Sequence, residues 1–362
     1  MTFWMQYGVM NFVINRLDNL DIGSNSYEFI PENVKKELQI AGGFVGTNGR
    51  LHVNQKDVML LIKNSDLRSQ IGENMYNALF RKPMLIFFKP TLEDELEASK
   101  EELDQKYGLA TIHLNNFAQA FSLGCWFLKD SCVCSEYIYW VNMFNGYNAQ
   151  SRRDMSVTLS NGQIKEISLT KEEMKEALER MHEVYAYLLP DESAMGKVEM
   201  TNSAGTIIWN IDNVVSMEGK SFARALILLQ EARRTGVISA KIEKYCSVLE
   251  CIYAIKEQNK KNIAEITAAY LGKDDAERNR IKDNMRTLYG VRSDDTHGSN
   301  IKYLQTKSKD ELINLSVELD DYVRNVLRKA FSAPELNYKN TSEDKARVRK
   351  IFKDLIQTSA GV

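Results

Sequence analysis

The feature that most constrains the fold of this chain is a change in hydrophobic pattern near Met217. From there to the C-terminus, apolar residues recur every three or four positions in successive segments. Such spacing puts one apolar stripe on each helix, and each stripe needs a neighbouring helix to cover it. The C-terminal part is therefore expected to be an all-α bundle.

Capping boxes mark the start of two of these helices. Asp274 with Glu277, and Ser308 with Glu311, have the spacing at which a cap and a later Glu satisfy each other's backbone donors. The stripes that define the bundle are Phe222, Leu226 and Leu229; Ile242, Tyr245, Leu249 and Ile252; Ile263, Ile266 and Tyr270; Ile281, Met285 and Leu288; and Leu312, Leu315, Leu319, Val323, Val326 and Phe331.

The first 215 residues have a different pattern, in which short β-type runs alternate with helical segments. Two Asn-Gly pairs lie between such runs and predict hairpins over 44–53 and 156–169. Further strands are predicted over 82–90, 110–113, 137–141 and 198–211, and helices over 91–106 and 169–189. No P-loop, GxGxxG or HExxH motif occurs in this part.

The predicted fold is an α+β N-terminal domain, residues 1–215, followed by an all-α helical bundle, residues 216–333, and a basic helical tail, residues 334–362. Charge follows the same division. Residues 1–217 carry 20 Lys and Arg against 28 Asp and Glu, a net charge of −8, whereas residues 218–362 carry 27 against 21, a net charge of +6. The C-terminal part is the better candidate to bind an anionic partner, and solvated helix faces are the alternative explanation.

Composition also restricts the compartment. No run of 18 or more apolar residues and no signal peptide is recognised, so we expect no membrane association. The five Cys include no CxxC pair, which indicates a reduced, cytoplasmic protein without a zinc site. Cys132 and Cys134 are interpreted as small apolar residues of a strand, with a metal or redox pair as the alternative.

A polar segment between the fourth and fifth stripes contains the candidate catalytic residues. Arg292 and His297 are separated by four residues. On one regular helix their side chains would diverge by about 140°. We therefore expect Gly290 to end one helix, and Ser293 or Asp294 to cap a second helix with His297 in its first turn.

The chemistry of this pair suits RNA. Arginine binds a phosphate bidentately, and an imidazole transfers protons near neutral pH. The 2′-hydroxyl of RNA can attack the adjacent phosphate, so neither a protein nucleophile, a metal nor another cofactor is required. Arg292 would stabilise the charge that develops on the phosphorane, and His297 would act as general acid or base.

This Arg-x4-His in an all-α setting resembles the HEPN superfamily of ribonucleases. The upstream run from Arg233 to Glu250 looks like the Apea-like branch, and the resemblance covers about residues 218–332. It implies metal-independent cleavage that leaves a 2′,3′-cyclic phosphate. It also implies a composite site between two copies, hence a homodimer or higher oligomer.

The family often has Asn, Asp or His after the Arg, where this chain has Ser293. We therefore assign supporting roles to Ser293, Asp294 and Asp295. Glu250 resembles an acidic residue near the Arg–His pair of some relatives, and a structural ion pair is the alternative.

Arg233 and Arg234 are predicted to bind RNA phosphates, with a solvated helix end as the alternative. Many relatives are toxins or antiphage effectors in which a second domain senses a trigger, a role open to residues 1–215. The rival hypotheses are a non-catalytic module for dimerisation or nucleotide binding, and a sensor that acts through a partner protein.

Overall fold

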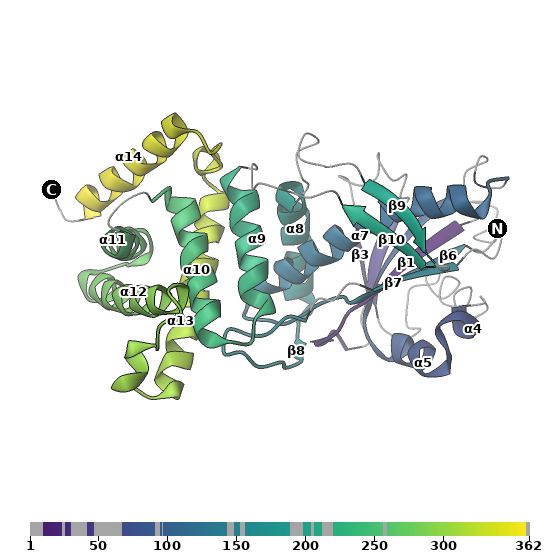
Figure 1. The fold of residues 1–362 in the computed structure, drawn as a ribbon, viewed down its shortest axis with the longest axis horizontal. Helices are drawn as coiled ribbons and strands as arrows, with labels where there is room; N and C mark the ends of the chain where they lie inside the picture. Colours follow the sequence, from purple (N-terminus) through teal and green to yellow (C-terminus); the bar gives the residue numbers. More distant parts are fainter. Residues whose placement is uncertain are drawn as a thin grey trace. The chain divides into compact units, whose positions relative to one another are not determined.

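The computed structural model describes residues 10–23, 26–29, 42–46, 67–90, 95, 97–142, 148–152, 156–188, 198–203, 206–211, 220–255 and 259–359. The chain forms two compact units (Figure 1). The first unit comprises Met1–Ser156, Lys165–Ala186 and Met200–Trp209, and the second comprises Val157–Ile164, Tyr187–Glu199 and Asn210–Val362.

The first unit is built on a six-stranded sheet in the order β3-β4-β5-β1-β6-β7, and all neighbours are antiparallel. The central strand β1 is apolar at Phe12, Val13 and Ile14 because side chains on both of its faces are buried. The strands are β1 (Met10–Arg16), β3 (Ser26–Phe29), β4 (Gly42–Gly46), β5 (Met84–Pro90), β6 (Tyr137–Asn142) and β7 (Asn148–Arg152).

Helices cover both faces of this sheet. On one face, Ile14 and Ile86 form a buried cluster with Leu79, which belongs to α5 (Glu73–Arg81). The shorter α4 (Leu67–Ile71) contributes Leu67 to the same cluster. The other face meets α7 (Lys100–Leu128), where the rings of Phe87 and Phe117 lie 5.1 Å apart. Beyond α7 lies α8 (Lys171–Leu188), whose Tyr185 ring is 4.9 Å from Phe117.

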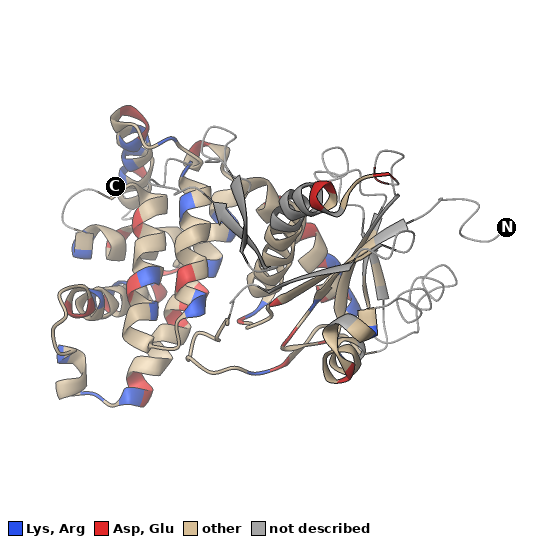
Figure 2. Cartoon of the chain, turned by 45° about the vertical axis from the view of Figure 1, so that its right-hand side comes forward, with Lys and Arg blue, Asp and Glu red and all other residues tan. Residues whose placement is uncertain are grey.

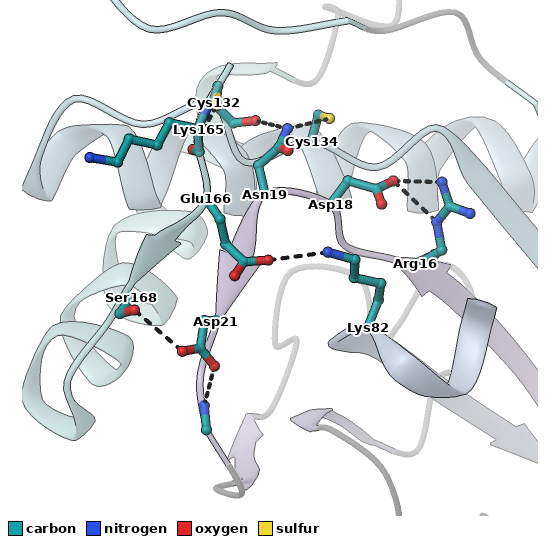
Figure 3. A network of polar contacts seen from close by, with 11 residues as sticks. Arg16, Asp18, Asn19, Asp21, Lys82, Cys132, Cys134, Lys165, Glu166 and Ser168 are labelled. Carbon is teal, nitrogen blue, oxygen red and sulfur yellow. Dashed lines mark hydrogen bonds and ion pairs between the residues drawn. The ribbon is translucent and has the colours of Figure 1, made fainter. Parts of the chain in front are cut away.

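A short parallel pair, β2 (Leu20–Asp21) with β8 (Ile167–Ser168), anchors the segment that precedes α8 (Figure 3). Asn19 Nδ2 donates to the Cys132 carbonyl oxygen at 3.0 Å. The Cys132 thiol donates to Lys165 O at 3.1 Å, and its sulfur accepts from Lys165 N–H at 3.3 Å. Cys132 and Cys134 are buried as predicted, but the predicted strand is absent, because Cys134 forms only an isolated bridge with Asp18.

The second unit is a helical bundle, as predicted. Its centre is α10, which packs against α9, α12 and α13. The stripes predicted from the sequence are its core, and Phe222, Ile242, Leu249 and Val323 have no exposed surface. The helices are α9 (Ser221–Arg234), α10 (Ile238–Tyr253), α11 (Asn259–Leu271), α12 (Asp275–Thr296), α13 (Lys309–Phe331) and α14 (Ser342–Ser359), with short 3₁₀ helices η2 (Lys302–Gln305) and η3 (Pro334–Leu336).

The segment after residue 333 is part of the bundle rather than a separate tail. Phe352 of α14 is buried, and its ring lies 4.9 Å from that of Tyr253 and 5.7 Å from that of Tyr270. Basic and acidic residues occur together on these helices (Figure 2). Many of the cations are paired within the unit, for example Arg280 with Glu318 at 3.3 Å.

The segment 157–164 does not form the predicted hairpin. Its turn at Asn161-Gly162 is present, with φ of 79° at Gly162, but no ladder flanks it. Ser160 O instead accepts from Ser316 Oγ at 2.7 Å. This non-local bond takes the place of strand pairing and joins the segment to α13 of the second unit.

Three other predictions for the N-terminal part of the sequence were wrong in detail. The expected strand 110–113 lies inside α7, because a four-residue apolar run does not distinguish a strand from part of a buried helix. The expected single strand 198–211 is two paired strands, β9 (Val198–Ser203) and β10 (Thr206–Ile211). The helix expected from residue 91 is described from Lys100.

Three predictions agree more closely with the structure. Strands β5 and β6 and helix α8 lie where the sequence placed them, and Thr170 caps α8 with Glu173 as its capping-box partner. The turn of the hairpin predicted over 44–53 lies outside the described residues. In the described part of the chain, no helix is long and apolar enough to span a bilayer.

Candidate active site

The helix that carries the candidate residues is longer than the sequence suggested. α12 runs through Gly290 without interruption and ends at Thr296, so Gly290 is not a helix terminus. No second helix begins at Ser293 or Asp294. His297 is the C-cap of α12, with φ of −90° and ψ of 5°, rather than a residue of a first turn.

The residue that ends the helix is Gly298. Its φ of 63° is left-handed, and its N–H donates to Asp295 O at 2.9 Å. Ser299 N–H donates to Asp294 O at 2.8 Å. These two bonds form a Schellman motif, which satisfies the last helix carbonyls and requires a left-handed residue at this position. Gly298 therefore has the role that the sequence assigned to Gly290.

Arg292 faces α10 and is only partly committed to structural contacts. Its Nη2 lies 3.3 Å from Glu250 Oε2, and the two side chains are 21% and 18% exposed. Its guanidinium carbon lies 5.2 Å from the centre of the Tyr289 ring. Among the described residues its Nε–H has no hydrogen-bond partner. The guanidinium is thus held in place, and because this Nε–H is buried, only the exposed part of the side chain is accessible to an anion.

Glu250 is itself held by two further side chains. Its Oε1 accepts from Tyr289 O–H at 2.8 Å and from Asn259 Nδ2 at 3.4 Å. Burial, followed by the hydrogen bond to Glu250, raises the pKa of Tyr289 to about 12. The phenol therefore stays protonated at neutral pH and remains a donor to the carboxylate. Glu250 connects three elements, since Asn259 belongs to α11 and Tyr289 to α12.

His297 lies in a different environment from Arg292. It is exposed, and its N–H donates to Ser293 O at 3.2 Å. Asp294 is buried at the same helix end, and its Oδ2 accepts the Lys302 N–H at 2.9 Å while Oδ1 lies 3.4 Å from Lys302 Nζ. That backbone bond, and next the charge of Lys302, lower the pKa of Asp294. Asp294 thus fixes the loop that follows the helix.

Within one chain, the structure does not bring Arg292 and His297 to the same point. Five positions along a helix correspond to a rotation of about 140° and a rise of about 7.5 Å. Arg292 is directed toward Glu250 on α10, whereas His297 is exposed at the helix end. The two side chains therefore extend from α12 in different directions.

The two predicted RNA-binding arginines differ sharply in accessibility. Arg233 is only 3% exposed, and its carbonyl oxygen accepts from Thr158 N–H at 2.8 Å. A buried side chain in this position offers no surface to a phosphate, so the prediction for Arg233 is not supported by its location. Arg234, the last residue of α9, is exposed.

Three residues that organise this site, Tyr289, Asn259 and Lys302, were not predicted from the sequence. Tyr289 lies three positions before Arg292, so it shares a helix face with it, a relation visible in the sequence only if α12 is taken as continuous. No local sequence pattern marks Asn259 or Lys302 as part of the site. In the described ranges no group of three or more His, Cys, Asp or Glu is arranged to hold a metal ion.

Comparison of the chain with protein-family models, with curated proteins and with solved structures gives no match.

Proposed function

We propose that the second unit is an RNA endonuclease of the HEPN type that needs no metal, with Arg292 as the phosphate clamp and His297 as the general acid and base. The observation that carries the proposal is the state of Arg292. Its side chain is 21% exposed and is oriented by Glu250, and it lies on the same helix as the exposed His297. Pre-oriented donors of this kind stabilise charge that develops in a transition state.

The proposed reaction is a transesterification. The 2′-oxygen forms a bond to phosphorus and loses its proton, while the bond from phosphorus to the 5′-oxygen breaks and that oxygen gains a proton. One imidazole acts as base and another as acid. Two copies of the chain supply two His297 side chains and two Arg292 guanidinium groups. The divergence of Arg292 and His297 on α12 supports this composite arrangement.

We further propose that the chain acts as a toxin or antiphage effector, in which the first unit senses a trigger that raises a basal rate of cleavage. Arg234, exposed at the end of α9, remains a candidate to contact an RNA phosphate.

The proposal is tested by incubating the full chain with mixed cellular RNA in excess chelator. We expect cleavage by the wild-type chain and none by Arg292→Ala or His297→Ala. Arg286→Ala is the matched control, because Arg286 lies on the same helix, is 45% exposed and pairs with Asp283 at 3.5 Å. It is expected to cleave like the wild type. Circular dichroism would show that each variant is folded.

Three results would contradict the proposal. Cleavage by His297→Ala would exclude His297 as the proton-transfer group. Activity that is lost in chelator and restored by a divalent metal would exclude the mechanism. Intact RNA with the wild-type chain would favour the non-catalytic module. The composite site also predicts that activity per chain falls on dilution, as dimers dissociate.

A further inference from the structure

An open cleft lies next to the candidate site, between the N-terminal end of α10 and the C-terminal end of α12. Its volume is about 590 Å³, within the range of small-ligand sites. Its principal lining residues are Ser239, Asp295, Asn300, Ile301, Leu304 and Gln305.

The cleft and the Arg292–Glu250 pair lie along the same contact between two helices. On α12, Arg292 and Asp295 are three residues apart, or about 4.5 Å along the axis, and so are neighbours on the helix surface. On α10, Ser239 and Glu250 lie on one face but are eleven residues apart, or about 16.5 Å along the axis. The cleft therefore approaches Arg292 through Asp295, and neighbouring nucleotides of one strand can occupy the cleft and contact Arg292.

The polar groups of the cleft are not used by the fold. In the described part of the chain, the side chains of Asp295, Asn300 and Gln305 make no hydrogen bond or ion pair. The contrast with Asp294 is direct, because both carboxylate oxygens of that residue contact Lys302. Asp295 and the two amides are therefore available to a ligand.

The chemistry of the lining favours a nucleobase over an anion or a metal ion. The lining residues include a carboxylate but no Lys or Arg, so a phosphate in the cleft would be repelled. A single carboxylate is too few ligands for a divalent cation. The apolar side chains of Ile301 and Leu304 can contact the flat face of a base, and amides and a carboxylate read the edges of unstacked bases.

We propose that this cleft binds an RNA base with an exocyclic amino group, on a nucleotide adjoining the phosphate that Arg292 binds. The inference rests on the proposed function for its biological role. Asp295 accepts hydrogen bonds from the amino group of adenine, cytosine or guanine. Uracil has no amino group, and its one edge donor, N3–H, lies between two carbonyl oxygens that the carboxylate repels. Asp295 is thus the specificity-determining residue.

The test measures binding of AMP, CMP, GMP and UMP to the full wild-type chain by calorimetry or NMR titration. The phosphate is common to all four nucleotides, so differences report the base. We expect UMP to bind about tenfold more weakly than the best of the other three, since one base contact discriminates to about this extent. Asp295→Asn should weaken the amino bases and strengthen UMP, because the new amide N–H₂ donates to a carbonyl of uracil.

Asp354→Asn is the matched control, because Asp354 is an exposed aspartate on α14 outside the cleft, and it should leave all four affinities unchanged. Equal affinities for the four nucleotides, binding of none of them, or a preference that Asp295→Asn does not alter would overturn the inference. The assay is independent of cleavage. If the chain prefers some bases but does not cleave RNA, the base-binding cleft is supported and the nuclease is rejected. If the chain cleaves RNA but shows no base preference, the nuclease is supported and the base-binding cleft is rejected.

Discussion

Replacement of Gly290 by Ala tests the course of α12, on which the geometry of the candidate site depends. Gly290 lies inside α12, six residues before its end, and does not have a left-handed φ. A Cβ added there would meet no other heavy atom within 4 Å. Ala is a better helix former than Gly, because it loses less backbone entropy on folding.

The expected effect is an increase in stability of roughly 0.5–1 kcal/mol. In a unit of this size that corresponds to a rise in melting temperature of roughly 1–4 °C. Gly298→Ala is the matched control. A Cβ at Gly298 would also meet no atom within 4 Å, but its φ is 63°. Only the backbone conformation distinguishes the two positions, and Ala at a left-handed position should lower stability by roughly 1–2 kcal/mol.

The assay is urea denaturation of the full chain, followed by hydrogen exchange of peptides that cover α12. Exchange resolves this helix even where the two units unfold separately. A loss of stability in Gly290→Ala, or a gain in Gly298→Ala, would show that the helix ends at Gly290. The divergence of Arg292 and His297, and the argument for a composite site, would then be wrong.

Three further outcomes follow from the structure. Gly124→Ala should destabilise the first unit by roughly 1–3 kcal/mol, measured by chemical denaturation, because the added Cβ would overlap Ala177 O where α7 and α8 meet. Tyr289→Phe should lower the free energy of unfolding by about 1 kcal/mol and reduce the rate of RNA cleavage, because Glu250 loses a donor at 2.8 Å and holds Arg292 less firmly. An unchanged cleavage rate would show that this hydrogen bond has no part in orienting Arg292. The lowered pKa of Asp294 means that its carboxylate stabilises the fold above the unfolded-state pKa, near 3.9, and that this contribution is lost as pH falls through the lower folded-state pKa. Asp294→Asn should therefore flatten stability against pH below about pH 4, and an unaltered acid profile would contradict the assignment.

Local sequence patterns sufficed for the bundle because each helix carries its own stripe. Leu249 and Val323 were expected in the core from spacing alone, and both are fully buried. The turn at Gly162 was also visible, since Asn-Gly favours tight turns. Its partner was not, because Ser160 and Ser316 are 156 residues apart and no local pattern connects them.

The end of α12 shows why helix termini are harder to predict than helices. Gly290 and Gly298 are both compatible with a helix stop, and the choice depends on bonds formed after the helix, such as Lys302 N–H to Asp294. The Arg-x4-His motif identified Arg292 and His297. The directions of their side chains could be derived only once the end of α12 was known to be at Gly298 rather than at Gly290. Asn259 entered the site from a separate helix, without any signal in its own sequence.

The measurement that tests the central claim most directly is an end-group analysis of a cleaved synthetic RNA. The substrate would be incubated with the wild-type chain in chelator, beside the same sequence with a 2′-deoxy sugar at the cleaved position. The account predicts 2′,3′-cyclic phosphate and 5′-hydroxyl ends from the first substrate, no cleavage of the second, and none of either by His297→Ala. Cleavage of the deoxy substrate, or 3′-hydroxyl ends, would show that the 2′-hydroxyl is not the nucleophile and would contradict the account.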